Sequence, residues 1–398
     1  MNIYRCSIFS SLILTLSLLS FLSFAECNPQ FGQVNNNGFG SPNNLYTWSL
    51  QPFKGYLFAS TYNPVDSGEI WRYDGNSWTQ VADDGFGNLN NQGMRTLLDF
   101  GGYLYAGTLN EVDGAELWRS VDGVTWEPLV VGGFGDIRNI SIRGMLQFQD
   151  YIYVGLQSQQ GDGAEIWRSL DGQNWQQVYS DSPDNDSAHS FAIFKGQLYA
   201  GIRNSSQGFS LVRSTDGVNF EFVVGGDSNT PAGLTSSNNL TPYDLHTFSF
   251  TSPLTGLPDE RLFIGVGNWV TGAAVYRTAD GVNFTAVTTD GFGNRSNKFA
   301  WRFHSFRGDL WLGLSNADIL KDGANVWRAV NGLNWQQMVG NDGLYAPAGF
   351  GNQTNWGVRS FATYDKKLYL GTAQCWADAC IPANVGTQVW EWRCATTN

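Results

Sequence analysis

The feature that most constrains this fold is a short segment that recurs along the chain. Its clearest copy, residues 114–126, reads GAELWRSVDGVTW, and related copies begin at Gly163 and Gly323. In each copy an apolar segment ends in Trp-Arg, a tight Asp-Gly or Asn-Gly turn follows, and another aromatic residue ends the segment. Asp-Gly and Asn-Gly tolerate the positive φ that a two-residue hairpin turn needs, so each copy predicts a β-hairpin.

A second hairpin precedes each of these segments, as in RTLLDFGGYLYAGT at residues 95–108. One unit therefore contains four short strands, and a GFGN-x-x-N loop or a close variant often follows. The units repeat every 46 to 48 residues in the first part of the chain and at longer intervals later. Self-similarity at this period, with four strands per unit, is typical of a β-propeller, and we count seven units. The aromatic residue before the first turn of the unit recurs at Phe53, Phe100, Phe148, Phe194, Phe306 and Tyr364.

The two ends of the chain each contain part of one unit. Residues 31–44 match the fourth strand and exit loop of residues 78–91, yet no earlier strands of a unit precede them. The last unit begins near Trp356 and has three strands before the chain ends. We therefore predict an all-β, seven-bladed propeller with four antiparallel strands per blade. The N-terminal strand would close the ring, because pairing the two ends removes an exposed sheet edge.

The first 25 residues are predicted to be a signal peptide. Arg5 supplies the positive charge, residues 8–22 form an apolar run, and small residues near Ala25 suit cleavage. A membrane anchor is the alternative, but the apolar run is short for a spanning helix. We expect a secreted or periplasmic protein, monomeric, in which residues 26–398 form a single propeller domain.

Four cysteines follow the signal peptide: Cys27, Cys375, Cys380 and Cys394. An even number in an exported chain predicts disulfides, although four cysteines allow three pairings. We favour Cys27–Cys394, which would join the two ends of the ring, and Cys375–Cys380, which would brace a local loop. A zinc site is disfavoured because no histidine lies near these cysteines in the sequence.

The turn segment resembles the Asp-box, or BNR repeat, of the sialidase-type β-propellers, whose pattern is Ser/Thr-x-Asp-x-Gly-x-x-Trp/Phe. Ser120, Asp122, Gly123 and Trp126 keep this order, but one residue is missing between Asp and Gly. In that family the box is structural, so the resemblance implies a propeller hairpin and no particular activity. The catalytic signatures of sialidases are not visible, and no catalytic residue is carried over.

One position near the start of the first strand of each unit is the candidate functional position. It lies two residues before an apolar residue, on the strand that faces the propeller axis, so its side chains would encircle one mouth of the channel. Arginines there would form a positive focus for an anion in a chain whose net charge is −12, and tryptophans would stack on a sugar ring. The seven residues are Trp48, Arg95, Arg143, His189, His246, Trp301 and Arg359.

Nearby loops add further candidates for the same pocket. We expect Tyr243 in the long loop before the fifth unit, Arg203 and Trp269 in loops between second and third strands, and Trp376 between two cysteines. The alternative for the ring is structural, with side chains that fill the channel or pair with buried carboxylates. The GFGN loops and Trp-Arg pairs are interpreted as packing between blades; a calcium ion or a sugar in each loop is the alternative.

Two classes of function fit these residues best. The first is a module that binds an acidic glycan or polysaccharide; an acidic chain without basic runs is a poor candidate for nucleic acid or anionic membranes. The second is a polysaccharide lyase that cleaves a uronic-acid glycan by β-elimination, with His189, His246 and Tyr243 as candidate acid or base. A structural or surface-adhesion protein is a third possibility. No cofactor is expected, with calcium as the alternative. We favour the binding module over the lyase because no set of candidate catalytic residues has a spacing that is diagnostic of an enzyme.

Overall fold

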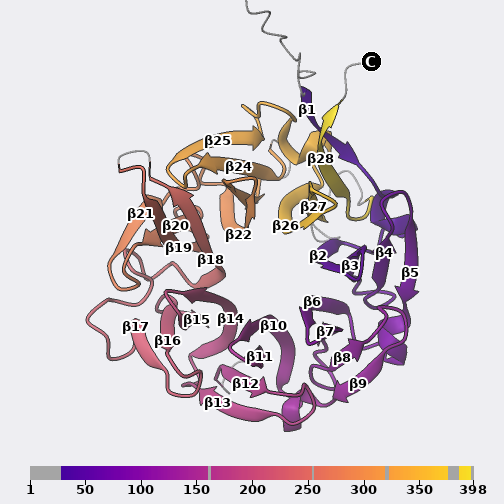
Figure 1. Cartoon of the computed structure of the whole chain (residues 1–398), viewed down its shortest axis with the longest axis horizontal. Helices are drawn as coiled ribbons and strands as arrows, with labels where there is room; N and C mark the ends of the chain where they lie inside the picture. Colours follow the sequence, from indigo (N-terminus) through magenta and orange to yellow (C-terminus); the bar gives the residue numbers. More distant parts are fainter. Residues whose placement is uncertain (1–27, 160–162, 253–254, 319–321, 375–384, 396–398) are drawn as a thin grey trace, which may run out of the picture.

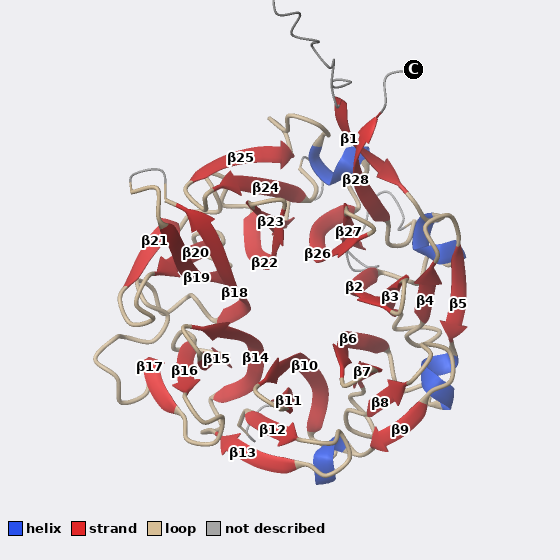
Figure 2. Ribbon diagram, in the orientation of Figure 1, coloured by secondary structure: helices blue, strands red, loops and turns tan. Residues whose placement is uncertain are grey.

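The computed structural model describes residues 28–159, 163–252, 255–318, 322–374 and 385–395. Within these ranges the chain forms β-strands that pair antiparallel, one after another, and short 3-10 segments, with no α-helix. Figures 1 and 2 show groups of four strands arranged around a central axis. We call each group a blade and name it by its innermost strand. None of the described residues belongs to a helix long and apolar enough to cross a membrane.

The strands become shorter from the axis outwards. The innermost strands are β2 (Tyr46–Phe53), β6 (Gly93–Phe100), β10 (Asn139–Phe148), β14 (Asn185–Phe194), β18 (Thr241–Thr251), β22 (Asn297–Phe306) and β26 (Asn355–Tyr364). The second strands are β3 (Tyr56–Tyr62), β7 (Tyr103–Leu109), β11 (Tyr151–Ser158), β15 (Gln197–Asn204), β19 (Pro258–Gly267), β23 (Asp309–Asn316) and β27 (Lys367–Gln374).

In the outer half of each blade, the third strand is largely buried and the outermost strand is more exposed. The third strands are β4 (Ile70–Tyr73), β8 (Leu117–Ser120), β12 (Glu165–Ser169), β16 (Ser210–Ser214), β20 (Ala274–Thr278), β24 (Asn325–Val330) and β28 (Val389–Ala395). The outermost strands are β5 (Trp78–Ala82), β9 (Glu127–Val130), β13 (Gln176–Ser180), β17 (Glu221–Val224), β21 (Phe284–Thr288), β25 (Asn334–Val339) and β1 (Asn28–Gln33).

The first described strand, β1, pairs antiparallel with the last one, β28. Phe31 lies opposite Trp392 in this register, and their ring centroids are 4.6 Å apart. Phe31 also contacts Phe350 edge-on, with centroids 5.3 Å apart. The two ends of the described chain therefore lie in one sheet, as Figure 1 shows, and their side chains share one hydrophobic cluster.

The GFGN loops pack neighbouring blades together. Phe86 adopts a left-handed backbone conformation (φ 62°) between two glycines, and its ring stacks on Trp118 with centroids 4.6 Å apart. The last asparagine of the loop, Asn91, donates hydrogen bonds to the Gly85 carbonyl (2.8 Å) and to Glu116 Oε2 (2.7 Å). These contacts confirm the predicted packing role of the phenylalanine. Calcium binding by the loops stays a prediction.

The Trp-Arg pairs and the Asp-Gly turns also have structural partners. The guanidinium of Arg119 lies 4.5 Å from the centroid of the Tyr103 ring, so its predicted role of covering an aromatic is confirmed. In the turn that follows, Asp122 Oδ1 accepts hydrogen bonds from the backbone N–H groups of Val124 (2.8 Å) and Thr125 (2.7 Å). These bonds lower the pKa of Asp122 to about 2. The repeated motifs therefore build the blades and leave the axis to other residues.

Candidate functional site

Each innermost strand has a β-bulge near its start. The pairing register with the second strand skips one residue there, so that residue has no partner across the ladder. Bulges often lie beside functional sites because they redirect a side chain away from the pleated sheet. One skipped residue from each strand forms the set considered below: Trp48, Arg95, Arg143, His189, Tyr243, Trp301 and Arg359. Four strands skip a second residue nearer their start: Ile140, Asp186, Lys298 and Trp356.

Six of the seven residues in this set are the ones predicted from the sequence. The seventh prediction, His246 in the β18 blade, is wrong. The bulge in β18 falls between Pro242 and Asp244, so Tyr243 and not His246 occupies the equivalent position. The alignment took Phe248 as the apolar residue that follows the ring position, whereas Leu245 occupies that place. Tyr243 itself was expected in a loop, but β18 already begins at Thr241.

His246 lies deeper along the axis. It lines a separate axial cavity of about 380 Å³ together with His304. His246 Nε2 is 2.8 Å from Ser305 Oγ, and His304 Nε2 is 2.8 Å from Thr363 Oγ1, so both rings have hydrogen-bond partners in the next blade. Both histidines are therefore hydrogen-bonded side chains of the channel wall.

The bulge residues meet at one end of the axis around a small cavity. This cavity has about 20 Å³ of free space, which is enough for one small group and far too little for a sugar ring. Arg302, whose neighbour Trp301 is the bulge residue, also lines it. Arg302 forms an ion pair with Asp244 at 2.9 Å and reaches into both axial cavities. The full lining is Trp48, Arg95, Arg143, His189, Tyr243, Trp301, Arg302 and Arg359.

One half of this cavity wall is aromatic. The rings of Trp301 and Trp356 meet edge-on with centroids 5.2 Å apart, and Phe299 stacks on Trp301 at 5.7 Å. Trp48 belongs to the same aromatic cluster and stacks on Tyr62 with centroids 4.6 Å apart. Trp48 and Trp301 are each only 4% exposed, so their faces are held rigidly by the surrounding rings.

Three arginines reach the cavity without a carboxylate partner among the described residues. Among the described residues, no Asp or Glu oxygen lies within ion-pair distance of Arg95, Arg143 or Arg359. The guanidinium groups of Arg95 and Arg359 instead lie 4.3 Å from the Trp48 ring and 4.6 Å from the Trp301 ring. The buried Nε of Arg143 has no hydrogen-bond partner in the described structure.

The electrostatic cost of this arrangement appears in the pKa values. Burial, and then the charge of Arg359, lower the pKa of Arg143 to about 9. Burial also lowers the pKa of Arg359 to about 10, while Tyr243 and Tyr46 act in the opposite direction. Both guanidinium groups are therefore less well stabilised than in water, and an anion in the cavity would restore that stabilisation.

His189 is neutral in this environment. Burial, followed by the charges of Arg143, Arg359 and Arg203, holds its pKa well below the usual range. Its Nδ1 lies 3.4 Å from Ser187 Oγ, and its ring meets the Tyr243 ring edge-on with centroids 5.1 Å apart. A neutral imidazole can accept or donate a hydrogen bond without adding to the positive charge of the ring.

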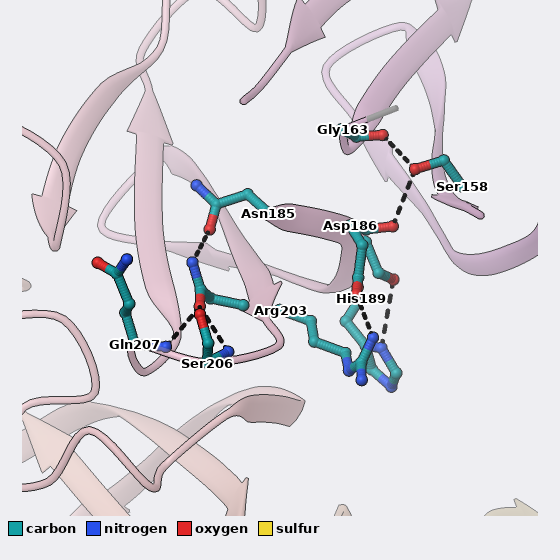
Figure 3. A network of polar contacts seen from close by, with 10 residues as sticks. Ser158, Gly163, Asn185, Asp186, His189, Arg203, Ser206 and Gln207 are labelled. Carbon is teal, nitrogen blue, oxygen red and sulfur yellow. Dashed lines mark hydrogen bonds and ion pairs between the residues drawn. The ribbon is translucent and has the colours of Figure 1, made fainter. Parts of the chain in front are cut away.

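A second, larger pocket opens beside the ring. Arg203 was expected in a loop but is the penultimate residue of β15, where its guanidinium forms an ion pair with Asp186 Oδ2 (Figure 3). The two residues line a cavity of about 610 Å³. The charge of Arg203 lowers the pKa of both Arg143 and His189, so this pocket adjoins the ring. Sequence reasoning missed Asp186, because only the fold brings it beside Arg203.

The remaining candidates are placed less centrally or lie outside the described residues. Trp269 is 56% exposed, and its ring meets Phe299 edge-on at 4.9 Å. Trp376, Cys375, Cys380 and Cys27 are outside the described residues, as is the side chain of Cys394, so the two disulfides stay predictions. Within the described ranges, no three His, Cys, Asp or Glu side chains come close enough to hold a metal ion.

No protein-family model matches the chain, and a search of curated proteins finds no match. Solved structures do match. An ulvan lyase described as bound to a glucuronic acid–rhamnose 3-sulfate glycan has a TM-score of 0.50 and 11% identity, over 92% of this chain and 96% of that one.

This chain is a β-propeller. The polysaccharide lyase Uly1 is similar with a TM-score of 0.49 and 11% identity, over 91% of this chain and 93% of that one. A lectin from Aleuria aurantia, in complex with a fucosylated glycan, has a TM-score of 0.45 and 11% identity, over 74% of this chain and 96% of that one. At identities this low the likeness shows the fold alone, and no site residue is assigned from these structures.

Proposed function

We propose that this propeller binds an acidic glycan at the mouth of its axis. The anionic group of the glycan would lie among Arg95, Arg143 and Arg359, which we call the arginine ring. One observation carries the proposal. Arg95, Arg143 and Arg359 converge on one cavity without a carboxylate partner among the described residues. Buried arginines are ordinarily paired, so this excess of positive charge favours an anionic ligand.

The size of the cavity and its walls narrow the class of ligand. About 20 Å³ of free space holds one water-sized group, so one oxygen of an anionic group would enter the ring and the rest of the ligand would lie outside it. Trp48 and Trp301 are buried and covered by Arg95 and Arg359, so what the opening offers a sugar hydroxyl is the hydrogen-bonding capacity of neutral His189. A uronic acid or a sulfated sugar meets both requirements.

The architecture and location complete the proposal. The chain would form seven blades, with β1 as the outermost strand of the β26 blade; the β1–β28 pairing supports this closure. A signal peptide ending near Ala25 would direct a monomeric protein out of the cytoplasm, and the shortened Asp-box would mark the hairpin of each blade. Disulfides Cys27–Cys394 and Cys375–Cys380 belong to the same proposal.

A lyase is the second candidate, and one arrangement favours it. His189 and Tyr243 meet edge-on at 5.1 Å in the same cavity as Arg143. In β-elimination from a uronic acid, Arg143 would neutralise the carboxylate, His189 would accept the C5 proton, and Tyr243 would protonate the leaving oxygen. The ulvan lyase noted above shares the fold, but at 11% identity this likeness does not extend to activity.

A panel of acidic and neutral polysaccharides tests both candidates. Binding is measured by isothermal titration calorimetry, and lyase activity by the ultraviolet absorbance of unsaturated uronic products. Binding of acidic polysaccharides without new absorbance supports the binding module, and rising absorbance supports the lyase. If acidic and neutral polysaccharides bind equally, or none binds, the arginine ring is not a glycan site.

A further inference from the structure

The pocket beside the arginine ring differs from it in both size and chemistry. With a volume of about 610 Å³ it has room for a whole sugar unit, whereas the ring cavity has about 20 Å³. Its wall comes from three neighbouring blades, through Glu111 after β7, Gln157 at the end of β11, and Asp186 at the start of β14. These three side chains all present acceptor oxygens.

Two of these acceptors are buried without a donor. Asp186 Oδ2 accepts from Arg203, but Asp186 Oδ1 has no hydrogen-bond partner, and the Asp186 side chain is only 7% exposed. Gln157 Oε1 is likewise buried and unpartnered. Each unsatisfied buried acceptor costs about 1–3 kcal/mol, so a ligand that donates hydrogen bonds here is favoured.

The neighbouring side chains do not satisfy these acceptors. The Ser158 hydroxyl already donates to the Gly163 carbonyl at 2.6 Å, as Figure 3 shows. Arg203 is held by Asp186, and this ion pair cancels the charge of the carboxylate. The pocket therefore offers acceptor oxygens, and the exposed carboxylate of Glu111 leaves it with a net negative charge, which suits hydroxyl donors and disfavours an anion.

We propose that this pocket is a second subsite, which takes a neutral, hydroxyl-rich sugar unit linked to the acidic unit in the arginine ring. This inference rests on the proposed function. The ring supplies donors and positive charge, and the pocket supplies acceptors, so the two sites together select an acidic sugar followed by a neutral one. Asp186 and His189 both lie on β14, whose Ser187 pairs with Arg203 on β15 and lies 3.4 Å from His189 Nδ1, so the two subsites lie side by side (Figure 3).

Calorimetry with three probes tests the subsite. The probes are D-glucuronate, disaccharides in which glucuronic acid is linked to glucose in either order, and cellobiose as the uncharged reference. Gln157→Leu removes one acceptor at nearly constant size. Asp186→Asn keeps an oxygen for Arg203 and puts a donor in place of the free acceptor. Gln177→Leu, on the exposed outer strand β13, is the matched control.

We expect at least one disaccharide to bind the unaltered protein about tenfold more tightly than glucuronate. Gln157→Leu should remove about three- to tenfold of that gain and leave the glucuronate affinity unchanged. Asp186→Asn also frees the charge of Arg203 beside the arginine ring, so its effect is measured as the ratio of disaccharide to glucuronate affinity, which should fall by a similar factor. Gln177→Leu should alter neither. Circular dichroism and thermal melting show whether each variant is folded, and Gln157→Leu carries the test if Asp186→Asn does not fold.

Two contrary results are distinguishable. If both disaccharides bind no more tightly than glucuronate, or Gln157→Leu weakens all probes equally, the subsite is refuted while the arginine ring stands. If the unaltered protein binds neither glucuronate nor the disaccharides, the proposed function fails and the subsite with it.

Discussion

The guanidinium group of Arg359 lies 4.6 Å from the centroid of the Trp301 ring, although the two residues belong to different blades. Both are the unpaired residues of β-bulges, in β26 and β22. The aromatic face takes the place of a carboxylate: it holds the arginine in position while leaving its charge uncompensated. The arginine is therefore both ordered and available to an anion.

The first prediction concerns the ring arginines. Arg143→Ala or Arg359→Ala should weaken binding of an acidic glycan by about 1.5–3 kcal/mol each, because each removes a charge-assisted hydrogen bond. Calorimetry on the folded variants measures this. Arg307→Ala is the control, since Arg307 is exposed in the turn at the opposite end of β22. Unchanged affinity in both ring variants would show that the ring is structural.

The second prediction is the pH dependence of binding. Because the pKa of Arg143 is lowered to about 9, a growing fraction of the unliganded protein loses this charge as the pH rises above that value. Affinity for an acidic glycan should therefore be nearly constant from pH 6 to 8 and should fall above pH 9. The Arg143→Ala variant should lack this fall in affinity above pH 9. A fall of equal size in the variant would exclude Arg143 as its origin.

The third prediction concerns acid stability. Burial first, then the nearby charges, lower the pKa of His246 to about 3 and that of His304 to about 4. Between these values and the unfolded pKa of about 6.5, the unfolded chain binds more protons, so acidification destabilises the fold. Each histidine should contribute at most about 1.4 kcal/mol per pH unit in this window.

Denaturant titrations at several pH values measure this effect. His304→Gln should flatten the decline in the free energy of unfolding between pH 4 and 6.5. The pKa of His189 is also lowered, so some decline in the free energy of unfolding remains in the His304→Gln variant. The slope of the variant is therefore compared with that of the unaltered protein. An unchanged slope in His304→Gln would contradict the prediction.

The fourth prediction is structural. Asn91 is fully buried, donates to Gly85 and Glu116, and accepts a bond from Asn110 at 3.0 Å. Asn91→Ala should cost about 2–4 kcal/mol of stability, because it leaves buried polar groups unpaired. Asn76→Ala, in an exposed turn, should cost far less. Glycan affinity per folded molecule should not change in either variant, and a loss of affinity in Asn91→Ala would implicate the GFGN loops in binding.

The fifth prediction is the disulfide between Cys27 and Cys394. The strand that begins at Asn28 pairs with β28, and Asn28 lies opposite Ala395. A bond that closes almost the whole chain should add on the order of 4–5 kcal/mol of stability, less any strain. Non-reducing peptide mapping should recover the two cysteine peptides linked. Recovery of Cys27 joined to Cys375 or Cys380 would refute the pairing.

The sequence was sufficient for the blade hairpins and for most of the ring, for a physical reason. Turn residues, Trp-Arg pairs and the apolar residue after each bulge are local features that recur in most copies. In the β18 blade the sequence alignment was shifted, because Leu245 and Phe248 are both apolar and either could follow the bulge position. His246 was then selected in place of Tyr243, since histidine also occupies this position in the β14 blade. Asp186 and Gln157 could not be found this way, because their pocket depends on contacts between blades that no single repeat encodes.

The bulges have a consequence for how such a site can change. A bulge residue makes no ladder pair across its blade, so its replacement leaves the backbone pairing of that blade intact. Arg95, Arg143 and Arg359 can thus be exchanged without breaking a ladder pair, whereas Trp48 and Trp301 also belong to a buried aromatic cluster. A library restricted to the three arginine positions would therefore vary the charge of the opening while the buried aromatic residues keep its shape.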